Sequence, residues 1–339
     1  MRQTKGMATT RLVIIAGIII VAGIVGAYFL YPHPKTQLIV STTTSLYETG
    51  FLAVLKQYFE QTNPGFNVSF ISQGTGQAIM TAQNGGADMI LVHAPSSELP
   101  FLTGGYGVDR KILAYNFFLI AGPSNDPAMI NSSQPLDAFK KIKAAGEAGK
   151  AIFVSRGDGS GTETKEKQLW AAAGINYTQI SKESWYLKVG QGMTATLLIA
   201  DQKNAYTLSD IASYLNNFNK GNIHLANLIY GGSDLLNVYS AIICNPQKIP
   251  NAKFDAAMAL VRYMVSDAGQ NLFNTFVPVG VPAQQSGGAV FKPLVQILKS
   301  GTPSDIAQMV KNYAYFKDSI GTLSECPTQY RYNAGDLYG

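Results

Sequence analysis

Residues 155–162, Ser-Arg-Gly-Asp-Gly-Ser-Gly-Thr, combine side chains and backbone freedom suited to holding an anion. Three glycines in five residues let the chain turn tightly and bring main-chain N–H groups close to a guest. Arg156 adds a guanidinium that stays protonated, and Ser160 and Thr162 add hydroxyl donors. The stretch follows the apolar run 151–154 and precedes a predicted helix, whose N-terminal end favours negative charge. The sequence therefore predicts an oxyanion site here, with a plain strand-to-helix turn carrying a surface Arg–Asp pair as the alternative.

Three further predicted strand-to-helix junctions are rich in glycine or hydroxyl residues, at 41–45, 73–77 and 190–194. Ligands of open α/β sheets bind outside the carboxyl ends of the strands, so we expect all four junctions to converge on one small guest. Acceptor-only side chains are few at these junctions. Asp158 is the main one, and beside Arg156 we expect it to orient the guanidinium. This donor-rich composition favours a fully ionised oxyanion over a protonated one such as hydrogen phosphate.

The residues needed for catalysis or for metal binding are missing from the four junctions. An enzyme that transfers phosphoryl groups needs a general base or metal ligands, and no His, Cys or paired carboxylate falls there. The three histidines, His33, His93 and His224, are expected in structural roles. The two cysteines, Cys244 and Cys326, lack metal-ligand spacing, and the sequence leaves open whether they pair. We therefore predict a binding protein with no enzymatic activity, cofactor or metal ion.

The composition is that of a globular protein large enough for two domains: 339 residues, of which 46% are hydrophobic. The formal net charge is +5, but four basic residues lie within the first 35 residues, which hold no Asp or Glu. The rest of the chain is close to neutral, so there is no electrostatic footprint for nucleic-acid binding.

The N-terminal region predicts a membrane anchor. Residues 12–30 form an uncharged apolar run of 19 residues, which is long enough to span a bilayer as a helix. Arg2, Lys5 and Arg11 precede it, which places the N-terminus in the cytoplasm and the body of the protein on the extracytoplasmic side of the cell membrane. A cleaved signal peptide is the alternative. We expect residues 36–339 without the anchor to be soluble and monomeric.

The hydrophobic pattern predicts alternating strands and helices, which is typical of an α/β protein with a parallel sheet. A capping box, Ser45-x-x-Glu48, predicts a helix that runs to about Gln61, and Ser209 is the predicted cap of another helix. Strands are predicted at 38–40, 66–71, 88–92, 113–121, 151–154, 184–189, 205–208, 225–230 and 237–244. Further helices are predicted at 75–83, 96–102, 136–146, 162–173, 194–202, 210–217, 252–265, 268–276, 291–299 and 304–317.

Several motifs, in order along residues 38–280, resemble those of one known family. The motifs are Thr42-Thr43-Thr44-Ser45, Gly74-Thr75-Gly76-Gln77-Ala78, Ala87-Asp88 with Leu91-Val92-His93, Gly105-Tyr106-Gly107-Val108, Ser155-Arg156-Gly157-Asp158 with Ser160-Gly161-Thr162, Gly190-Gln191-Gly192-Met193, Tyr206-Thr207-Leu208 with Asp210, and Asn245-Pro246. In these the chain resembles the tungstate-binding proteins of tungstate ABC importers, a branch of the class II periplasmic-binding-protein fold. The likeness ends near residue 285.

The resemblance implies two α/β lobes joined by a two-strand hinge, with the anion between them. Lobe one is expected at 36–121 plus 236–290 and lobe two at 122–235, preceded by the N-terminal flank, anchor and linker at 1–35 and followed by a C-terminal helical extension at 291–339. The family likeness assigns the anion contacts to Thr43, Thr44, Ser45 and Arg156, with Ser160, Gly161 and Thr162 beside them and main-chain contacts from Thr75 and Met193.

The implied function is capture of tungstate, with molybdate as a near-isosteric competitor, for delivery to an ABC permease in the membrane. A phosphate or sulfate receptor is the alternative within the same class. A phosphoryl-transfer enzyme and a membrane-anchored sensor or adhesion domain are the alternatives outside it.

Overall fold

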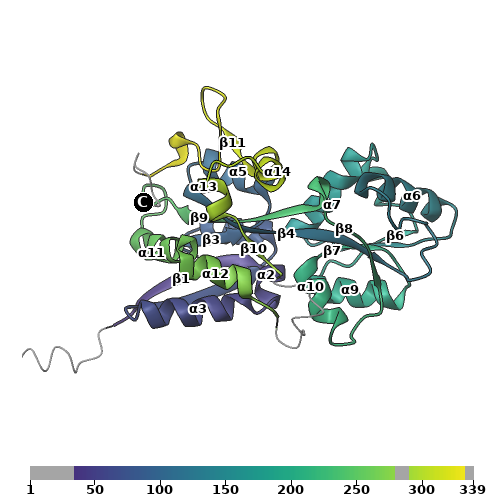
Figure 1. Ribbon diagram of the computed structural model, residues 1–339, viewed down its shortest axis with the longest axis horizontal. Coiled ribbons are helices and arrows are strands. Elements are labelled where there is room, and N and C mark those ends of the chain that lie inside the picture. The colour runs from purple at the N-terminus through teal and green to yellow at the C-terminus, as the bar shows by residue number, and fades with distance from the viewer. Residues whose placement is uncertain (1–33, 279–289, 333–339) are drawn as a thin grey trace, which may run out of the picture.

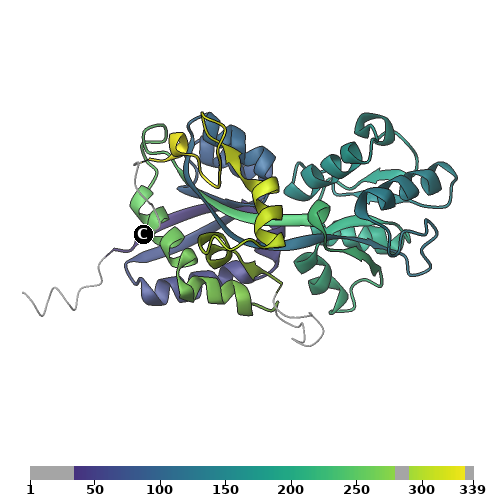
Figure 2. The ribbon, with the colours of Figure 1, turned by 45° about the horizontal axis from the view of Figure 1, so that its top comes forward.

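The computed structural model describes residues 34–278 and 290–332. Two α/β lobes lie side by side, and two long strands run from one lobe to the other (Figure 1). These strands are β4 (Gly107–Gly122) and β9 (Leu236–Cys244), which pair with each other in antiparallel fashion. The turned view shows the same two bodies and the same connection (Figure 2).

The first lobe is built on β1 (Thr36–Thr43), which pairs in parallel with β2 (Phe66–Gln73) and β3 (Met89–Val92). Side chains alternate across β1, so that Leu38 and Val40 face one apolar cluster and Ile39 faces another. The helices α3 (Phe51–Thr62), α11 (Phe254–Val265) and α12 (Asp267–Thr275) contribute to the first cluster, whereas α4 (Thr75–Gln83) and α5 (Pro95–Thr103) contribute to the second.

The second lobe contains the far end of the same sheet and a separate two-stranded sheet. The end of β4 pairs in antiparallel fashion with β7 (Thr207–Asp210) and β8 (Ala226–Tyr230), and β5 (Phe153–Ser155) pairs in parallel with β6 (Tyr186–Lys188). Its apolar core combines aliphatic and aromatic side chains, and the Phe139 and Trp170 rings meet edge to face in it with centroids 4.4 Å apart. The helices are α6 (Pro135–Glu147), α7 (Gly161–Ala172), α8 (Tyr177–Ile180), α9 (Met193–Gln202), α10 (Ile211–Phe218) and the 3₁₀ turn η1 (Ser233–Leu235).

The prediction of a parallel sheet holds for β1, β2 and β3 and for the pair β5 and β6, but it is wrong for the strands that pair with β4 or β9. The strand β9 runs antiparallel to both β3 and β4, and β4 is 16 residues long where the sequence predicted a strand at 113–121. The extra length has a physical reason, because one unbroken strand must cross from the first lobe to the second. Local hydrophobic patterns report burial and not the direction of a distant partner strand.

The C-terminal residues pack on the connecting strands. The helix predicted at 291–299 is instead the short strand β10 (Lys292–Pro293) followed by α13 (Val295–Lys299), and the one predicted at 304–317 is α14 (Asp305–Ala314) followed by β11 (Phe316–Lys317). The strand β12 (Leu323–Ser324) pairs with β11, and the 3₁₀ turn η2 (Thr328–Tyr330) comes last. From α14, Val310 joins Leu236 and Val238 of β9 in one apolar cluster.

A buried cation fixes the C-terminal segment to β4. Arg110 forms a fully buried ion pair with Glu98, with Nε 2.7 Å from Oε2. The Arg110 Nη1 atom also donates to the carbonyl oxygens of Ala314 and Glu325, each at 2.8 Å. Because an unpaired buried guanidinium is costly, these contacts tie the end of the chain to the first lobe.

The membrane anchor predicted at 12–30 lies outside the described residues. Within 34–278 and 290–332, no helix has the length and apolar character needed to cross a membrane. Cys244 and Cys326 are both buried free thiols, which answers the open question of a disulfide between them.

Candidate oxyanion site

The first lobe contributes the turn between β1 and α2 (Thr44–Glu48). The predicted capping box is wrong in its register: the cap is Thr43, whose Oγ1 accepts the main-chain N–H of Leu46 at 3.3 Å. Gly50, with φ of 82°, separates α2 from α3, so the single predicted helix is two. This register leaves Thr43, Thr44 and Ser45 together at the carboxyl end of β1.

The second lobe contributes the loop after β5. Gly157 and Gly159 adopt φ values of 66° and 71°, which glycine tolerates without strain, and they let the loop fold back on itself. Asp158 accepts from Arg156 Nε at 2.9 Å and from the main-chain N–H of Ser160 at 3.1 Å. The prediction that Asp158 orients the guanidinium is therefore confirmed.

The helix α7 begins at this loop. Ser160 is its cap, because the Ser160 Oγ accepts the Glu163 N–H at 3.2 Å. Gly161 and Thr162 form the first turn behind the cap, where main-chain N–H groups have no partner within the helix. This puts the positive end of a 12-residue helix beside Arg156.

The two halves of the site touch directly. The Nη2 atom of Arg156 donates to Thr44 Oγ1, and the main-chain N–H of Gly76 donates to the carbonyl of Gly159 at 3.4 Å. A Cβ atom at Gly161 would lie 3.1 Å from Thr75 Oγ1, so only glycine allows this close approach without displacing a neighbour. The structure thus brings together the predicted junctions at 41–45, 73–77 and 155–162.

Three buried donors of the predicted site have no hydrogen-bond partner among the described residues: Arg156 Nη1, Thr75 Oγ1 and Thr162 Oγ1. Arg156 is 1% exposed, and Thr75 and Thr162 are similarly buried. Buried polar groups are nearly always paired in folded proteins, so a group of such donors near one guanidinium marks a place prepared for an acceptor. A guest rich in acceptor oxygens suits all three.

The fourth predicted junction, at 190–194, contacts the first lobe through Glu48. Thr194, on α9, donates to Glu48 Oε2 at 3.1 Å, and a Cβ atom at Gly192 would lie 3.1 Å from Glu48 Oε1. Met193 has a fully buried side chain that belongs to the apolar core, so its contribution to a guest is limited to the main chain. Burial raises the pKa of Glu48, whereas the hydrogen bond from Thr194 lowers it.

His93 belongs to the site, although the sequence predicted only a structural role. It follows β3 directly, its Nε2 lies 3.1 Å from Ser45 Oγ, and its Nδ1 lies 2.9 Å from Asn237 Oδ1. Burial lowers its pKa to about 4, and the positive charge of Arg156 contributes to the lowering. The available signal was its position at the carboxyl end of a strand, on the same edge of the sheet as Ser45.

The sequence predicted no role in the site for Asp210 either. It caps α10 by accepting the Ser213 N–H at 2.8 Å, so the prediction of Ser209 as the cap is wrong. Its Oδ2 is buried and has no partner among the described residues. Burial raises the pKa of Asp210, and the charge of Arg156 partly offsets that rise.

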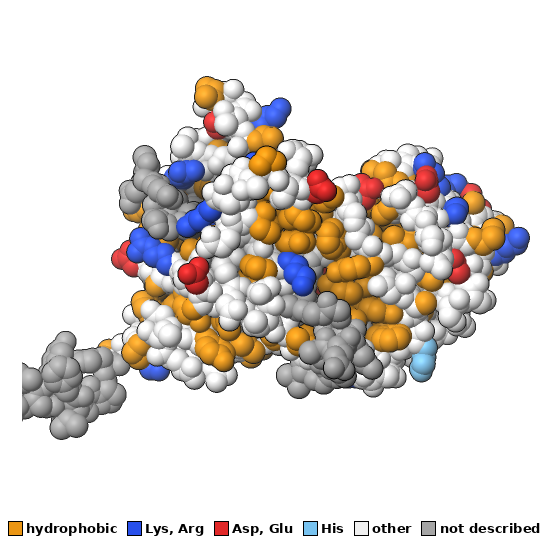
Figure 3. Space-filling view, in the orientation of Figure 1, with side chains coloured by type: hydrophobic (Ala, Val, Ile, Leu, Met, Phe, Trp, Pro, Cys, Tyr) orange, Lys and Arg blue, Asp and Glu red, His pale blue; other side chains and the backbone are white. Residues whose placement is uncertain are grey.

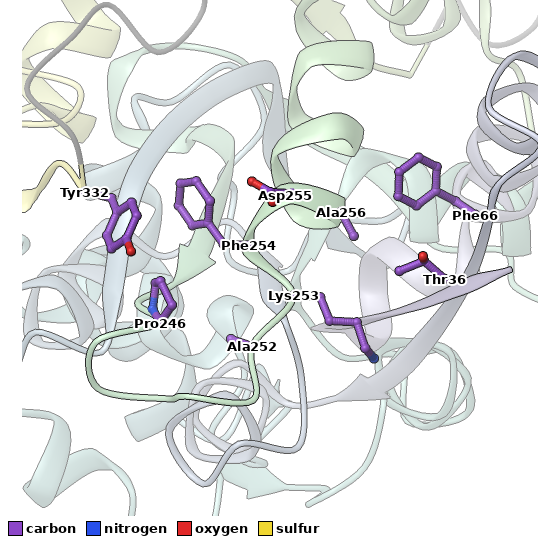
Figure 4. A pocket seen from close by; sticks show the side chains of 9 residues that line it. All are labelled: Thr36, Phe66, Pro246, Ala252, Lys253, Phe254, Asp255, Ala256 and Tyr332. Atoms are coloured by element: carbon purple, nitrogen blue, oxygen red, sulfur yellow. The ribbon is translucent and has the colours of Figure 1, made fainter. Parts of the chain in front are cut away.

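The chemistry of the site is that of an anion receptor. It offers a guanidinium, hydroxyl groups and the start of a helix, and within 34–278 and 290–332 no group of three or more His, Cys, Asp or Glu residues is arranged to hold a metal ion. A hollow of about 570 Å³ elsewhere, on the first lobe, lies between the start of β1, the start of α11 and the rings of Phe254 and Tyr332, which are tilted against each other (Figure 4). None of the predicted site residues lines it.

The chain is similar in sequence to a known domain family and to several known proteins. Residues 31–268 match the model of a PBP superfamily domain. A Haloferax volcanii protein described as a putative ABC transporter anion-binding protein is 43% identical over 252 residues, which are 72% of this chain and 70% of that protein. The tungstate-binding protein TupA of Peptoclostridium acidaminophilum is 34% identical over 242 residues, which are 71% of this chain and 82% of TupA.

The solved structures agree with the sequence comparisons. The tungstate-binding protein TupA from Desulfovibrio alaskensis G20 superimposes with a TM-score of 0.64 at 37% identity, covering 76% of this chain and 98% of that one. The two-lobed mixed sheet, the loops that meet at Arg156 and these likenesses lead to one assignment. The chain belongs to the PBP superfamily, in the family that includes the TupA tungstate-binding proteins.

Proposed function

We propose that this protein captures tungstate outside the cytoplasm and delivers it to an ABC importer. The observation that carries the proposal is the meeting of unpaired buried donors from both lobes, Thr75 Oγ1 from the first and Arg156 Nη1 and Thr162 Oγ1 from the second. A tetrahedral dianion presents four acceptor oxygens and no proton, which suits such a set. Relatives named for tungstate binding support the same choice.

In this proposal the anion is held by nine residues, namely Thr43, Thr44, Ser45, Thr75, Arg156, Ser160, Gly161, Thr162 and Met193. The lobes comprise 36–121 plus 236–290 and 122–235, and 291–339 form a C-terminal extension. The protein is a monomer without enzymatic activity, held at the cell membrane by the N-terminal run 12–30, and its lobes present a docking surface to an ABC permease. Molybdate, which has nearly the same shape, competes for the site.

Asp210 supports phosphate as a second candidate. An ionised buried carboxylate can only accept hydrogen bonds, so beside Arg156 it favours a guest that brings a proton, such as hydrogen phosphate. Burial raises the pKa of Asp210 and so favours its protonated form, which is a donor and suits a fully ionised guest. We favour tungstate because of the unpaired donors from both lobes and the relatives named for tungstate binding.

The test is a direct determination of the bound element. The full-length protein is incubated with equimolar tungstate, molybdate, phosphate and sulfate, desalted, and analysed by inductively coupled plasma mass spectrometry. We expect close to one tungsten per chain and much less phosphorus and sulfur. Stoichiometric phosphorus with no tungsten would replace tungstate by phosphate as the guest.

A further inference from the structure

A chain of hydrogen bonds leads from the proposed site to the connecting strands. His93 contacts Ser45 through Nε2 at 3.1 Å and Asn237, on β9, through Nδ1 at 2.9 Å. Asn237 continues the chain to Asn116 on β4 and to the Tyr239 hydroxyl. These side chains are buried, so their hydrogen bonds are shielded from bulk water.

The amide of Asn237 fixes the direction of this chain. Its Nδ2 donates to Asn116 Oδ1 at 2.8 Å and to the Tyr239 hydroxyl at 3.0 Å, which leaves Oδ1 facing His93. A carbonyl oxygen can only accept, so His93 Nδ1 carries the proton. His93 is neutral at pH 7, because burial lowers its pKa to about 4, and its Nε2 is therefore a bare acceptor.

The direction of these hydrogen bonds decides whether the Ser45 hydroxyl can donate its proton to a guest. A serine hydroxyl has one proton, and Nε2 of His93 can only accept it. Thr43 Oγ1, 3.3 Å from Ser45 Oγ, is then left as the donor of that pair, while it accepts from the Leu46 N–H. Thr44 differs, because its Oγ1 accepts from Arg156 and its own proton stays free.

We propose that His93 is a positioning residue that draws the hydroxyl protons of Ser45 and Thr43 away from the bound oxyanion. Side-chain donation to the guest then falls to Arg156, Thr44, Thr75 and Thr162, whereas Ser45 and Thr43 hold the guest through their main chain and the shape of the turn, which an alanine side chain at position 45 leaves in place. This inference rests on the proposed function for the guest, but the direction of the hydrogen bonds does not.

Nitrogen NMR of His93 tests the direction without any ligand. His33 and His224 are the other two histidines of the chain, so the full-length His33→Gln/His224→Gln variant in mild detergent carries His93 as its only histidine. With ¹⁵N-labelled histidine at pH 7 we expect a protonated Nδ1 and an unprotonated Nε2. A protonated Nε2, which requires both asparagine amides to be turned over, would overturn the inference.

Calorimetry with tungstate tests the consequence for binding. Thr75→Val removes a hydroxyl that has no protein partner and should weaken binding about tenfold or more, as expected for a hydrogen bond to a charged group. Ser45→Ala, the matched variant, should weaken it no more than about threefold, because only a neutral hydrogen bond to His93 is lost. An equal loss in both variants would contradict the inference, whereas a wild-type protein that binds no tungstate would contradict the proposed function itself.

The variant Asn237→Asp should reverse the direction of these hydrogen bonds. A carboxylate at this position stabilises protonated His93, whose Nε2–H then donates to Ser45 Oγ and releases the Ser45 proton toward the guest. We expect tungstate affinity to gain a pH-dependent step that coincides with the titration of His93 in the NMR spectrum. A His93 that titrates in this variant while affinity stays unchanged would count against the positioning role.

Discussion

Arg156, in the loop after β5, donates through Nη2 to Thr44 Oγ1 at the start of α2. This hydrogen bond joins the two lobes at the centre of the proposed site, and Asp158 holds the other side of the same guanidinium through Nε. With those two contacts made, Nη1 is the part of Arg156 left for a guest. The arginine therefore acts both as a cross-link between the lobes and as an anion donor.

Replacing Arg156 should abolish most of the affinity. Arg156→Ala removes the buried charge and its hydrogen bonds, and we expect a loss of about 2–5 kcal/mol in the binding free energy, the range for breaking one partner of a buried charge pair. Arg156→Lys keeps the charge but not the planar fork, so its affinity should be intermediate and its discrimination among oxyanions poorer. Isothermal titration with tungstate measures both. A folded Arg156→Ala protein with wild-type affinity would show that the loop is not the anion site.

Tungstate should raise the melting temperature. A ligand that binds only the folded state stabilises it by mass action, so the shift should grow with the logarithm of the concentration once the site is saturated. Phosphate and sulfate at the same concentrations should produce much smaller shifts. Differential scanning calorimetry of the full-length protein compares them, and equal shifts with phosphate would favour the second candidate guest.

The pH dependence of binding should report on Asp210. The groups that face it are Arg156, Glu48 and Tyr239, each coupled to its charge. Its pKa is raised by burial, and a nearby dianion raises it further, so tungstate binding should take up a proton and tighten as the pH falls toward that pKa.

Asp210→Asn supplies the matched control for this pH dependence. The amide is a fixed neutral donor of the same shape, so the variant should bind tungstate at pH 8 at least as well as wild type and should not take up this proton. Titrations in buffers of different ionisation enthalpy count the protons directly. If wild type takes up no proton at any pH of the titration series, Asp210 stays ionised in the complex or is remote from the guest.

Local features of the fold were predictable from the sequence. The helix at 75–83 and the glycine-rich loop that carries Arg156 were found because periodicity and turn residues act over a few positions. The pairing of β9 with β3 and β4 could not be predicted, since it depends on residues more than 100 positions apart. The cap at Thr43 was missed because four neighbouring hydroxyl residues offer equivalent candidates.

The hydrogen-bond donors of the site could be predicted from the sequence, but the buried residues that contact those donors could not. Thr44, Thr75 and Arg156 stand out because glycines and hydroxyls gather at strand ends. His93 and Asp210 lie in motifs of the family likeness but outside the four predicted junctions, and their roles come from distant partners such as Ser45, which lies 48 positions from His93. A buried titratable group becomes meaningful only when the fold shows what it faces.

The N-terminal run should determine where the protein resides. Removal of residues 1–35 should release a soluble monomer, because residues 12–30 are the long apolar stretch of the sequence and the aromatic and aliphatic core of both lobes is internal. Hydrophobic side chains do gather where the lobes meet on one face, beside the C-terminal helices (Figure 3). Size-exclusion chromatography with light scattering gives the mass, and a dimer would point to that face as a contact between copies.

Gly161 should control how closely the lobes approach. A methyl group at this position would lie 3.0 Å from His93 Cε1 and 3.1 Å from Thr75 Oγ1, tighter than ordinary van der Waals contact; both neighbours are buried, and hydrogen bonds to Ser45 and Asn237 hold the His93 ring in place. Gly161→Ala should therefore cost about 1–3 kcal/mol, the range for overpacking, in the state where the lobes touch. Gly65→Ala is the matched control, because nothing lies within 4 Å of its added methyl group. We expect calorimetry to show weaker tungstate binding in Gly161→Ala alone, and small-angle scattering to show a smaller compaction on tungstate addition. Wild-type affinity and compaction in Gly161→Ala would mean that the approach of Gly161 to Thr75 and His93 is not needed to hold the guest.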